Sequence, residues 1–210
     1  MKAILFDFWG TLVENGVWSP VKQVKDMLHI TVPFSEYVVR MERAMMTEKF
    51  PTLRDAFLQV FQEFHIEKDE EVLQELVGMW NKSWMLAQPY EETAEVLKRL
   101  QEKYLLLLLS NSDCFSVKNV LDKFKLQPYF TKIFLSYEIG LLKTDKSFMK
   151  VVLDDVRLLV EDCVLVGDSL QSDIAAAQKI GMDAILVDRK NTRPFEKKIK
   201  SLRELEEVLV

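Results

Sequence analysis

The apolar residues of the chain follow two patterns, and each predicts a different kind of element. Short runs made up mostly of apolar residues occur at 3–8, 104–110, 132–135, 164–166 and 184–187. Runs of this length are typical of strands that are buried on both faces. After residue 89, segments with apolar residues at helical spacing lie between these runs, at 91–102, 116–124, 147–154 and 172–180. Strands that alternate with helices predict a doubly wound parallel sheet, an α/β fold.

Residues 14–88 carry only the helical pattern. Ser19 before Pro20 is a helix start signal, and Ser35 can cap a helix over 36–49. Thr52 and Asp69 can open two more helices, and the apolar stripe after Thr52 contains Leu53, Ala56, Phe57, Val60, Phe61 and Phe64. We therefore predict two domains: a Rossmann-like core formed by residues 1–13 and 89–210, and an all-helical domain of residues 14–88 inserted after the first strand.

Composition narrows the possible partners. The 210 residues include 49% hydrophobic and 29% charged residues, and the formal net charge is −5. The positive residues form no stripe, which argues against binding to nucleic acid or to an anionic membrane. The leucine run at 105–109 is far shorter than the roughly 20 residues of a membrane-spanning helix, and no targeting segment is visible. We therefore expect a cytoplasmic protein. Two cysteines without a CxxC motif, together with two histidines, indicate neither a disulfide framework nor a zinc site.

Polar residues follow four of the predicted strands at the point where each ends. Parallel strands place their carboxyl ends at one edge of the sheet, where ligands bind. The residues that this rule brings together are Asp7, Gly10, Thr11, Ser110, Asn111, Lys143, Asp168 and Asp173.

The charges at this edge predict a metal and a phosphate. Asp7, Asp168 and Asp173 would repel one another, and Lys143 offsets only one of the three negative charges. A divalent cation brings the total to zero, and oxygen ligands without thiolate or imidazole suit Mg²⁺. Gly10 allows close backbone approach, and the N–H groups after it can bind the anion.

Four motifs carry a family resemblance. "DFWGTL", "LSNS", "GLLK" and "GDSLQSD" occur in this order, each after a predicted strand. Together they resemble the haloacid dehalogenase superfamily, and the resemblance covers the whole chain, including a helical cap inserted after the first motif. It implies a Rossmann-like α/β core, a Mg²⁺ cofactor and a small phosphorylated molecule as substrate.

The resemblance also implies roles for individual residues. Asp7 is the nucleophile that forms a covalent aspartyl intermediate. Thr11, Ser110 and Lys143 support it: Ser110 hydrogen-bonds the transferring group, and Lys143 holds both the nucleophile and the transferred charge.

The same resemblance implies a ligand set for Mg²⁺. Asp7, Asp168 and the backbone carbonyl of Trp9 are the expected ligands. Asp173 is a further ligand, or supports the site through water or Lys143. Trp9, Gly10 and Asn111 are expected beside the substrate.

Trp9 departs from the family pattern. Phosphatases of this superfamily carry a second aspartate at this position, which protonates the leaving oxygen and later activates water. An indole N–H cannot move a proton near neutral pH. We therefore expect a Mg²⁺-dependent phosphatase that is slow or that favours activated leaving groups.

Two alternatives remain open. Dehalogenases of the superfamily carry an aromatic residue at the position of Trp9, and Asn111 is compatible with them. In that case Arg40 or Arg43 would bind the substrate carboxylate, but these enzymes use no metal and lack the acid that stands here as Asp168. The second alternative is an inactive relative that binds a phosphorylated ligand.

Overall fold

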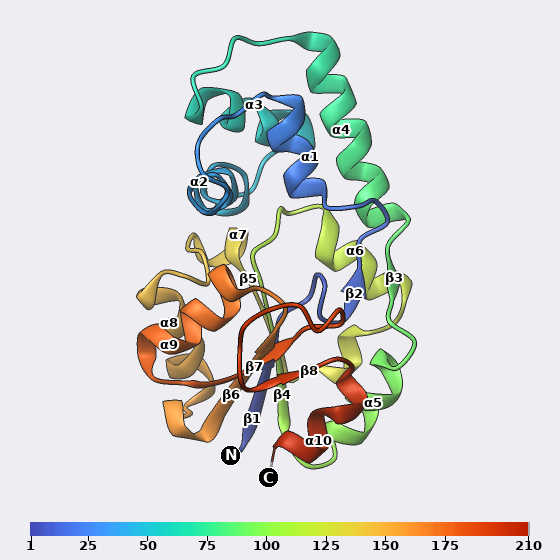
Figure 1. The fold of residues 1–210 in the computed structure, drawn as a ribbon, viewed down its shortest axis with the longest axis vertical. Coiled ribbons are helices and arrows are strands. Elements are labelled where there is room, and N and C mark those ends of the chain that lie inside the picture. Colours follow the sequence, from blue (N-terminus) through green and yellow to red (C-terminus); the bar gives the residue numbers. More distant parts are fainter. Residues whose placement is uncertain (210) are drawn as a thin grey trace.

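The computed structural model describes residues 1–209, and its core is a six-stranded parallel sheet (Figure 1). The strand order is β5-β4-β1-β6-β7-β8. The strands are β1 Ala3–Phe6, β4 Leu105–Ser110, β5 Lys132–Leu135, β6 Cys163–Gly167, β7 Asp183–Val187 and β8 Lys198–Ile199. The predicted doubly wound α/β fold is confirmed.

Helices cover both faces of the sheet because the central strands are apolar on both sides. On one face α5 Thr93–Leu100, α6 Ser116–Lys123 and α10 Leu205–Val208 contribute to a hydrophobic cluster with β1 and β4. On the other face α8 Lys146–Val156 and α9 Ala175–Ile180 contribute to a second cluster. Strand β1 is completely buried between the two clusters, so its carboxyl end delivers Asp7 to the middle of the sheet edge.

Four further helices form a bundle beyond that edge, which we call the helical cap (Figure 1). They are α1 Pro20–Met27, α2 Phe34–Met46, α3 Leu53–Glu63 and α4 Glu70–Met85. A third hydrophobic cluster lies among them. Thr52 forms a capping box with Asp55, and Asp69 accepts the N–H groups of Glu71 and Val72, as expected for residues that begin helices.

A short antiparallel pair joins the cap to the core. Strand β2, Val13–Glu14, pairs with β3, Gln88–Pro89, so both connections between the two parts leave the core side by side. The sequence showed no strand signal here, because two residues are too few for an alternating pattern.

Several helices and strands begin or end at other residues than the sequence predicts. The first strand ends at Phe6 rather than at residue 8, because the chain turns at Gly10, whose φ is +76°. Helix α2 begins at Phe34 after Pro33, so Ser35 does not cap it. A π-helical turn, Leu170–Ile174, precedes α9, and the short helix α7, Ser136–Ile139, was not predicted. Among the described residues, no helix is both long enough and apolar enough to cross a membrane.

Candidate active site

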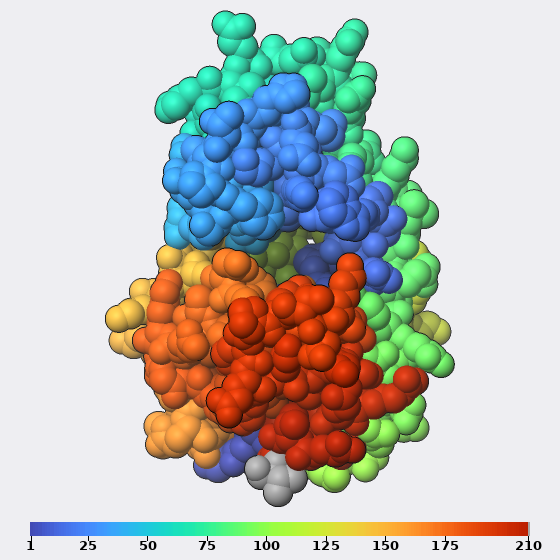
Figure 2. Space-filling view, in the orientation of Figure 1, coloured from blue at the N-terminus to red at the C-terminus, as the bar shows by residue number. Residues whose placement is uncertain are grey.

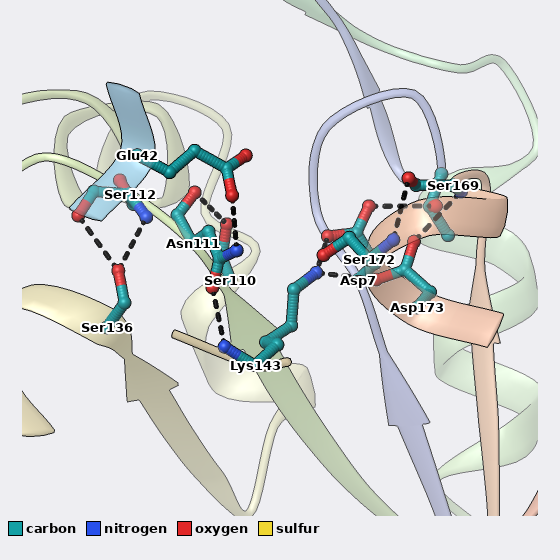
Figure 3. Close-up of polar contacts among 11 residues, drawn as sticks. Asp7, Glu42, Ser110, Asn111, Ser112, Ser136, Lys143, Ser169, Ser172 and Asp173 are labelled. Carbon is teal, nitrogen blue, oxygen red and sulfur yellow. Dashed lines mark hydrogen bonds and ion pairs between the residues drawn. The ribbon is translucent and has the colours of Figure 1, made fainter. Parts of the chain in front are cut away.

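Residues from separate elements meet at the carboxyl edge of the sheet (Figure 3). Asp7 follows β1, Asn111 follows β4, and Lys143 lies in the loop between α7 and α8. Asp168 follows β6, and Asp173 lies in the π-helical turn after it. The convergence that the parallel topology predicts therefore occurs in the structure.

Lys143 lies between two carboxylates. Its Nζ is 2.5 Å from Oδ1 of Asp7 and 2.6 Å from Oδ1 of Asp173, and all three side chains are buried. Burial alone would lower the pKa of Lys143, but Asp173 and Asp7 outweigh it and hold that pKa above its usual value. The lysine is therefore a permanent positive charge at this site.

Asp7 is held on both of its oxygens. The Thr11 hydroxyl donates to Oδ2 at 3.1 Å, while Lys143 donates to Oδ1. Burial and the neighbouring Asp173 raise the pKa of Asp7 to about 6, and Lys143 limits the rise. At neutral pH the carboxylate is mostly ionised and has a fixed orientation, as a nucleophile requires.

Three acids form a cluster that can hold a metal ion. Carboxylate oxygens of Asp7, Asp168 and Asp173 lie within 4.8 Å of one another. Burial, with Asp7 and Asp173 nearby, raises the pKa of Asp168 to about 7. Among residues 1–209 the Asp168 carboxylate accepts no hydrogen bond, and the nearest cationic group is that of Arg193 at 3.7 Å. An acid in this environment fits a cation ligand.

Gly10 leaves the space that this arrangement needs. A Cβ atom added to Gly10 would lie 2.5 Å from Oδ2 of Asp168, and the positive φ of Gly10 also disfavours other residues. The loop that follows Asp7 can therefore lie directly against Asp168. Hard oxygen donors in a tight group suit Mg²⁺, so the residues present fit the expected ion.

A cavity of about 330 Å³ lies between this edge and the cap. Figure 2 shows a hollow between the two parts on one face of the molecule. The core contributes Asp7, Trp9, Gly10, Asn111, Ser112, Asp113, Ser116, Lys143, Asp168, Ser169, Ser172 and Asp173. The cap contributes Asn15, Ser19, Pro20, Val21, Val38, Glu42, Met46, Trp80, Ser83 and Trp84.

The Ser110 side chain does not point into the cavity, although we expect it to hydrogen-bond the transferring group. Its hydroxyl is fully buried, donates to the backbone oxygen of Asn111 at 3.3 Å, and does not line the cavity. Asn111 is placed instead between the two parts of the site. Its Oδ1 accepts the Lys143 backbone N–H at 2.9 Å.

Three tryptophans line the cavity. Trp9 packs edge-to-face on Phe8, with ring centroids 4.9 Å apart, and also borders the cavity. Trp80 and Trp84 stand four residues apart on α4, a spacing that indicates helix packing. Trp80 does pack on Phe57, yet its Nε1 also reaches across to Asp113 of the core at 2.9 Å. The tryptophans therefore combine packing with a position at the cavity wall.

Arg40 and Arg43 do not meet the expectation of substrate contact, since neither lines the cavity. Arg40 bonds to Glu63 at 2.6 Å and to Glu36 at 3.1 Å within the cap. Arg43 bonds to Asp145 of the core at 2.9 Å. Ion pairs already occupy both guanidinium groups.

Sequence reasoning missed Glu42. This residue lines the cavity from α2 and accepts a hydrogen bond from Nδ2 of Asn111 at 2.7 Å. Val38 and Met46, four residues before and after it, line the same cavity. The sequence signal that could have identified Glu42 is its place between Val38 and Met46, because residues four apart lie on the same face of a helix.

Known proteins resemble this chain along its whole length. The family model for haloacid dehalogenase-like hydrolases matches residues 1–181. Glyceraldehyde 3-phosphate phosphatase of Methanocaldococcus jannaschii is 24% identical, covering 100% of this chain and 97% of the relative. The corresponding protein of Methanothermobacter thermautotrophicus is 25% identical, covering 91% and 88%.

Solved structures share the fold. The HAD-hydrolase YfnB of Bacillus subtilis, bound to magnesium, superposes with a TM-score of 0.68 at 20% identity, covering 99% of this chain and 98% of that one. L-2-haloacid dehalogenase from Xanthobacter autotrophicus has a TM-score of 0.67 at 15% identity, covering 100% and 98%. The same fold thus occurs in a magnesium-bound HAD-hydrolase and in a dehalogenase, so the reaction must be argued from the site.

Proposed function

The chain belongs to the haloacid dehalogenase-like hydrolases, and we propose that it hydrolyses phosphate monoesters with Mg²⁺ through a phosphorylated Asp7. The observation that carries the proposal is the cluster of Asp7, Asp168 and Asp173 around Lys143. This set has three negative charges and one positive charge. It suits a divalent cation together with the dianion of a phosphate ester.

The proposed ligands are Asp7, Asp168, Asp173 and the backbone carbonyl of Trp9. Bound there, Mg²⁺ would neutralise charge on the transferring phosphoryl group. The N–H groups that follow Gly10 are proposed to bind phosphate oxygens. The phosphatase names of the relatives from two methanogens support a phosphorylated small molecule as substrate.

Asp7 performs the first step in this proposal. Its carboxylate attacks phosphorus, a bond to phosphorus forms, and the bond to the ester oxygen breaks. Thr11 and Lys143 keep the carboxylate oriented and ionised for the attack. Lys143 also faces the charge that the transferred group brings. Water then attacks the aspartyl phosphate, which releases phosphate and restores Asp7.

Trp9 limits the substrates that this residue set can process alone. The indole has no proton to give to a leaving oxygen near neutral pH. General acid–base assistance contributes about 10²–10⁴-fold to a rate. Without such help the reaction favours aryl and acyl phosphates, whose leaving groups need little protonation.

A second candidate is metal-independent dehalogenation of a 2-haloacid. The aromatic Trp9 favours it, since halide leaves without a proton. Against it, no arginine of the described part of the chain lines the cavity to bind a carboxylate, and Lys143 is already bonded to two acids. Asp168 would also repel an anionic substrate in the absence of a cation. A third candidate is a relative that binds a phosphorylated ligand without turning it over.

One panel tests the three candidates. The protein is assayed with p-nitrophenyl phosphate and with 2-chloropropionate, each in Mg²⁺ and in EDTA. We expect phosphate release in Mg²⁺ alone, and its loss in Asp7→Asn. Chloride release in EDTA would support the dehalogenase instead. Binding of p-nitrophenyl phosphate with no release of either product would support the non-catalytic relative.

A further inference from the structure

Glu42 is the only charged side chain that the cap contributes to the cavity lining among the described residues. It lies on α2 between Val38 and Met46, on the face that is turned toward the core. The opposite wall contains the nucleophile and its lysine. An acid that faces a reactive phosphate centre across a small cavity needs a physical explanation, because its negative charge would oppose binding of a phosphate dianion.

Hydrogen bonds connect Glu42 to the nucleophile (Figure 3). Nδ2 of Asn111 donates to Oε2 of Glu42 at 2.7 Å, and Oδ1 of the same amide accepts the backbone N–H of Lys143, the residue whose side chain contacts Asp7, at 2.9 Å. Lys143 then contacts Asp7 at 2.5 Å. Within residues 1–209 no hydrogen bond reaches Oε1 of Glu42. One oxygen is thus anchored, while the other remains available to a bound molecule.

The surroundings of Glu42 favour its neutral form. Burial is the largest cause that raises the pKa of Glu42 to about 7, and Asp173 and Asp7 add to it. The hydrogen bond from Asn111 and the charge of Lys143 act in the opposite direction. On the cap side the neighbouring ionisable group is Tyr37, whose pKa lies above its usual value because of burial, Asp26 and Glu42. A carboxyl group of this kind can both give and take a proton near neutral pH.

We propose that Glu42 is the proton donor for the leaving oxygen, and that the cap in this way supplies the group missing at Trp9. The proposal rests on the phosphatase function proposed above. Anchored by Asn111, the carboxyl group lines from the cap side the same cavity that Asp7 lines from the core side. If Asp7 attacks phosphorus in line, the ester oxygen leaves on the side away from Asp7, toward the cap.

The protons balance over one turnover. As the bond from phosphorus to the ester oxygen breaks, the electron pair moves to that oxygen, and the proton of Glu42 moves with it to give the free alcohol. Glu42 is then a carboxylate. It takes a proton from the water that attacks the aspartyl phosphate, which leaves phosphate, an ionised Asp7 and a protonated Glu42.

The test compares two leaving groups in Glu42→Gln. Glutamine keeps the shape, and its amide oxygen can still accept from Asn111, but it has no proton to transfer. We expect kcat/KM for ethyl phosphate to fall by about 10²-fold or more, since its alkoxide needs a proton. We expect kcat/KM for p-nitrophenyl phosphate to stay within about threefold of the wild-type value, because kcat/KM reports formation of the aspartyl phosphate and not its hydrolysis. We also expect the high-pH limb of the kcat/KM profile for ethyl phosphate to disappear.

Two further variants sharpen the result. Glu36→Gln makes the same chemical change on the exposed side of α2, and we expect it to leave both substrates unaffected. Trp9→Asp in the Glu42→Gln background restores an acid at the position used by related phosphatases, and we expect it to recover ethyl phosphate hydrolysis. Thermal unfolding of each variant establishes that the fold is retained.

Failure of this inference is distinct from failure of the proposed function. If the wild type hydrolyses both esters and Glu42→Gln lowers both equally or neither, the proton-donor role is overturned and the phosphatase stands. If the wild type releases no phosphate from either ester in Mg²⁺, both are overturned. If Glu42→Gln does not fold, Glu42→Asp takes its place in the test. The proposal then requires that kcat/KM falls for ethyl phosphate and not for p-nitrophenyl phosphate.

Discussion

The two walls of the cavity differ in how their charges are arranged. On the core wall, Asp7, Lys143 and Asp173 are bonded to one another. Among residues 1–209, the cap wall consists of apolar side chains, one amide, two serine hydroxyls and a single carboxyl group, that of Glu42. The core wall is fixed before any substrate arrives, which suits chemistry that must be the same for every substrate. The cap wall faces the core wall across the cavity, a position that suits contact with the leaving group of a substrate.

The walls also differ in how they are held together. Within the core wall, buried ion pairs join residues that belong to one sheet edge. Between the walls, Asn111 bonds to Glu42, Trp80 bonds to Asp113, and Arg43 bonds to Asp145. These contacts can break when the cap moves on the β2–β3 pair, and such movement would admit substrate. The comparison predicts large effects from core-wall substitutions and selective effects from cap-wall substitutions.

The largest effect is expected for Lys143→Met. Removing the cation leaves Asp7 and Asp173 buried without their shared partner, which destabilises a protein by about 3–5 kcal/mol. We expect a loss of that size in the free energy of unfolding of the metal-free protein near neutral pH, measured by urea denaturation, with phosphatase activity below detection.

Lys179→Met is the matched control. Lys179 is exposed and bonds to the backbone oxygen of Thr144, in the loop that carries Lys143. We expect its unfolding midpoint and its activity to match those of the wild type. A Lys143→Met protein as stable as this control would contradict the view that the core wall depends on its central charge.

The next largest effect is the dependence of protein stability on pH and on Mg²⁺. The folded protein holds the pKa of Asp7 at about 6 and that of Asp168 at about 7, both above the usual value of an aspartate. Both groups therefore bind protons more tightly when folded, so the stability they contribute is present at low pH and is lost as pH rises through these pKa values. We expect metal-free protein to lose stability between about pH 4 and pH 8.

Mg²⁺ should reverse this trend, because binding requires the deprotonated acids. We expect Mg²⁺ to raise the melting temperature more at pH 8 than at pH 5.5, as measured by calorimetry. Asp168→Asn should remove most of the Mg²⁺ effect and reduce the pH dependence. An equal Mg²⁺ effect at both pH values would show that the ion does not bind through these acids.

The smallest effect is expected for Arg40→Ala. Arg40 makes its contacts within the cap: ion pairs with Glu36 and Glu63, and a hydrogen bond to the Glu63 backbone oxygen. Half-exposed ion pairs of this kind contribute little to stability. We expect kcat/KM for p-nitrophenyl phosphate to stay within about threefold of the wild-type value. A large rise in KM would place Arg40 at the substrate and would weaken the contrast between the two walls.

The residues of the core wall could be predicted from the sequence because the parallel strand topology brings them to one edge of the sheet. Once the strands are parallel, the residues that follow each strand must meet at one edge, as Asp7, Lys143 and Asp168 do. Short-range detail was less predictable: the Ser110 hydroxyl turns to a backbone oxygen, and no sequence pattern specifies that rotamer.

The cap wall could not be predicted in the same way. Residues two apart on an α-helix point in nearly opposite directions, since each residue turns the helix by about 100°. Arg40 and Glu42 stand in that relation on α2, so the face that packs on the core decides which one reaches the cavity. The orientation of the cap decides this. The sequence suggested Arg40 or Arg43 for the dehalogenase alternative, and in the structure Glu42 lines the cavity and neither arginine does.

Identification of the covalent intermediate tests the central claim most directly. Wild-type protein turning over p-nitrophenyl phosphate in Mg²⁺ is quenched in acid, and its peptides are analysed by mass spectrometry. The account predicts one added phosphoryl group on the peptide that contains Asp7, and no addition in Asp7→Asn. Phosphate release without a phosphorylated Asp7 peptide, or with the phosphoryl group on another residue, would contradict it.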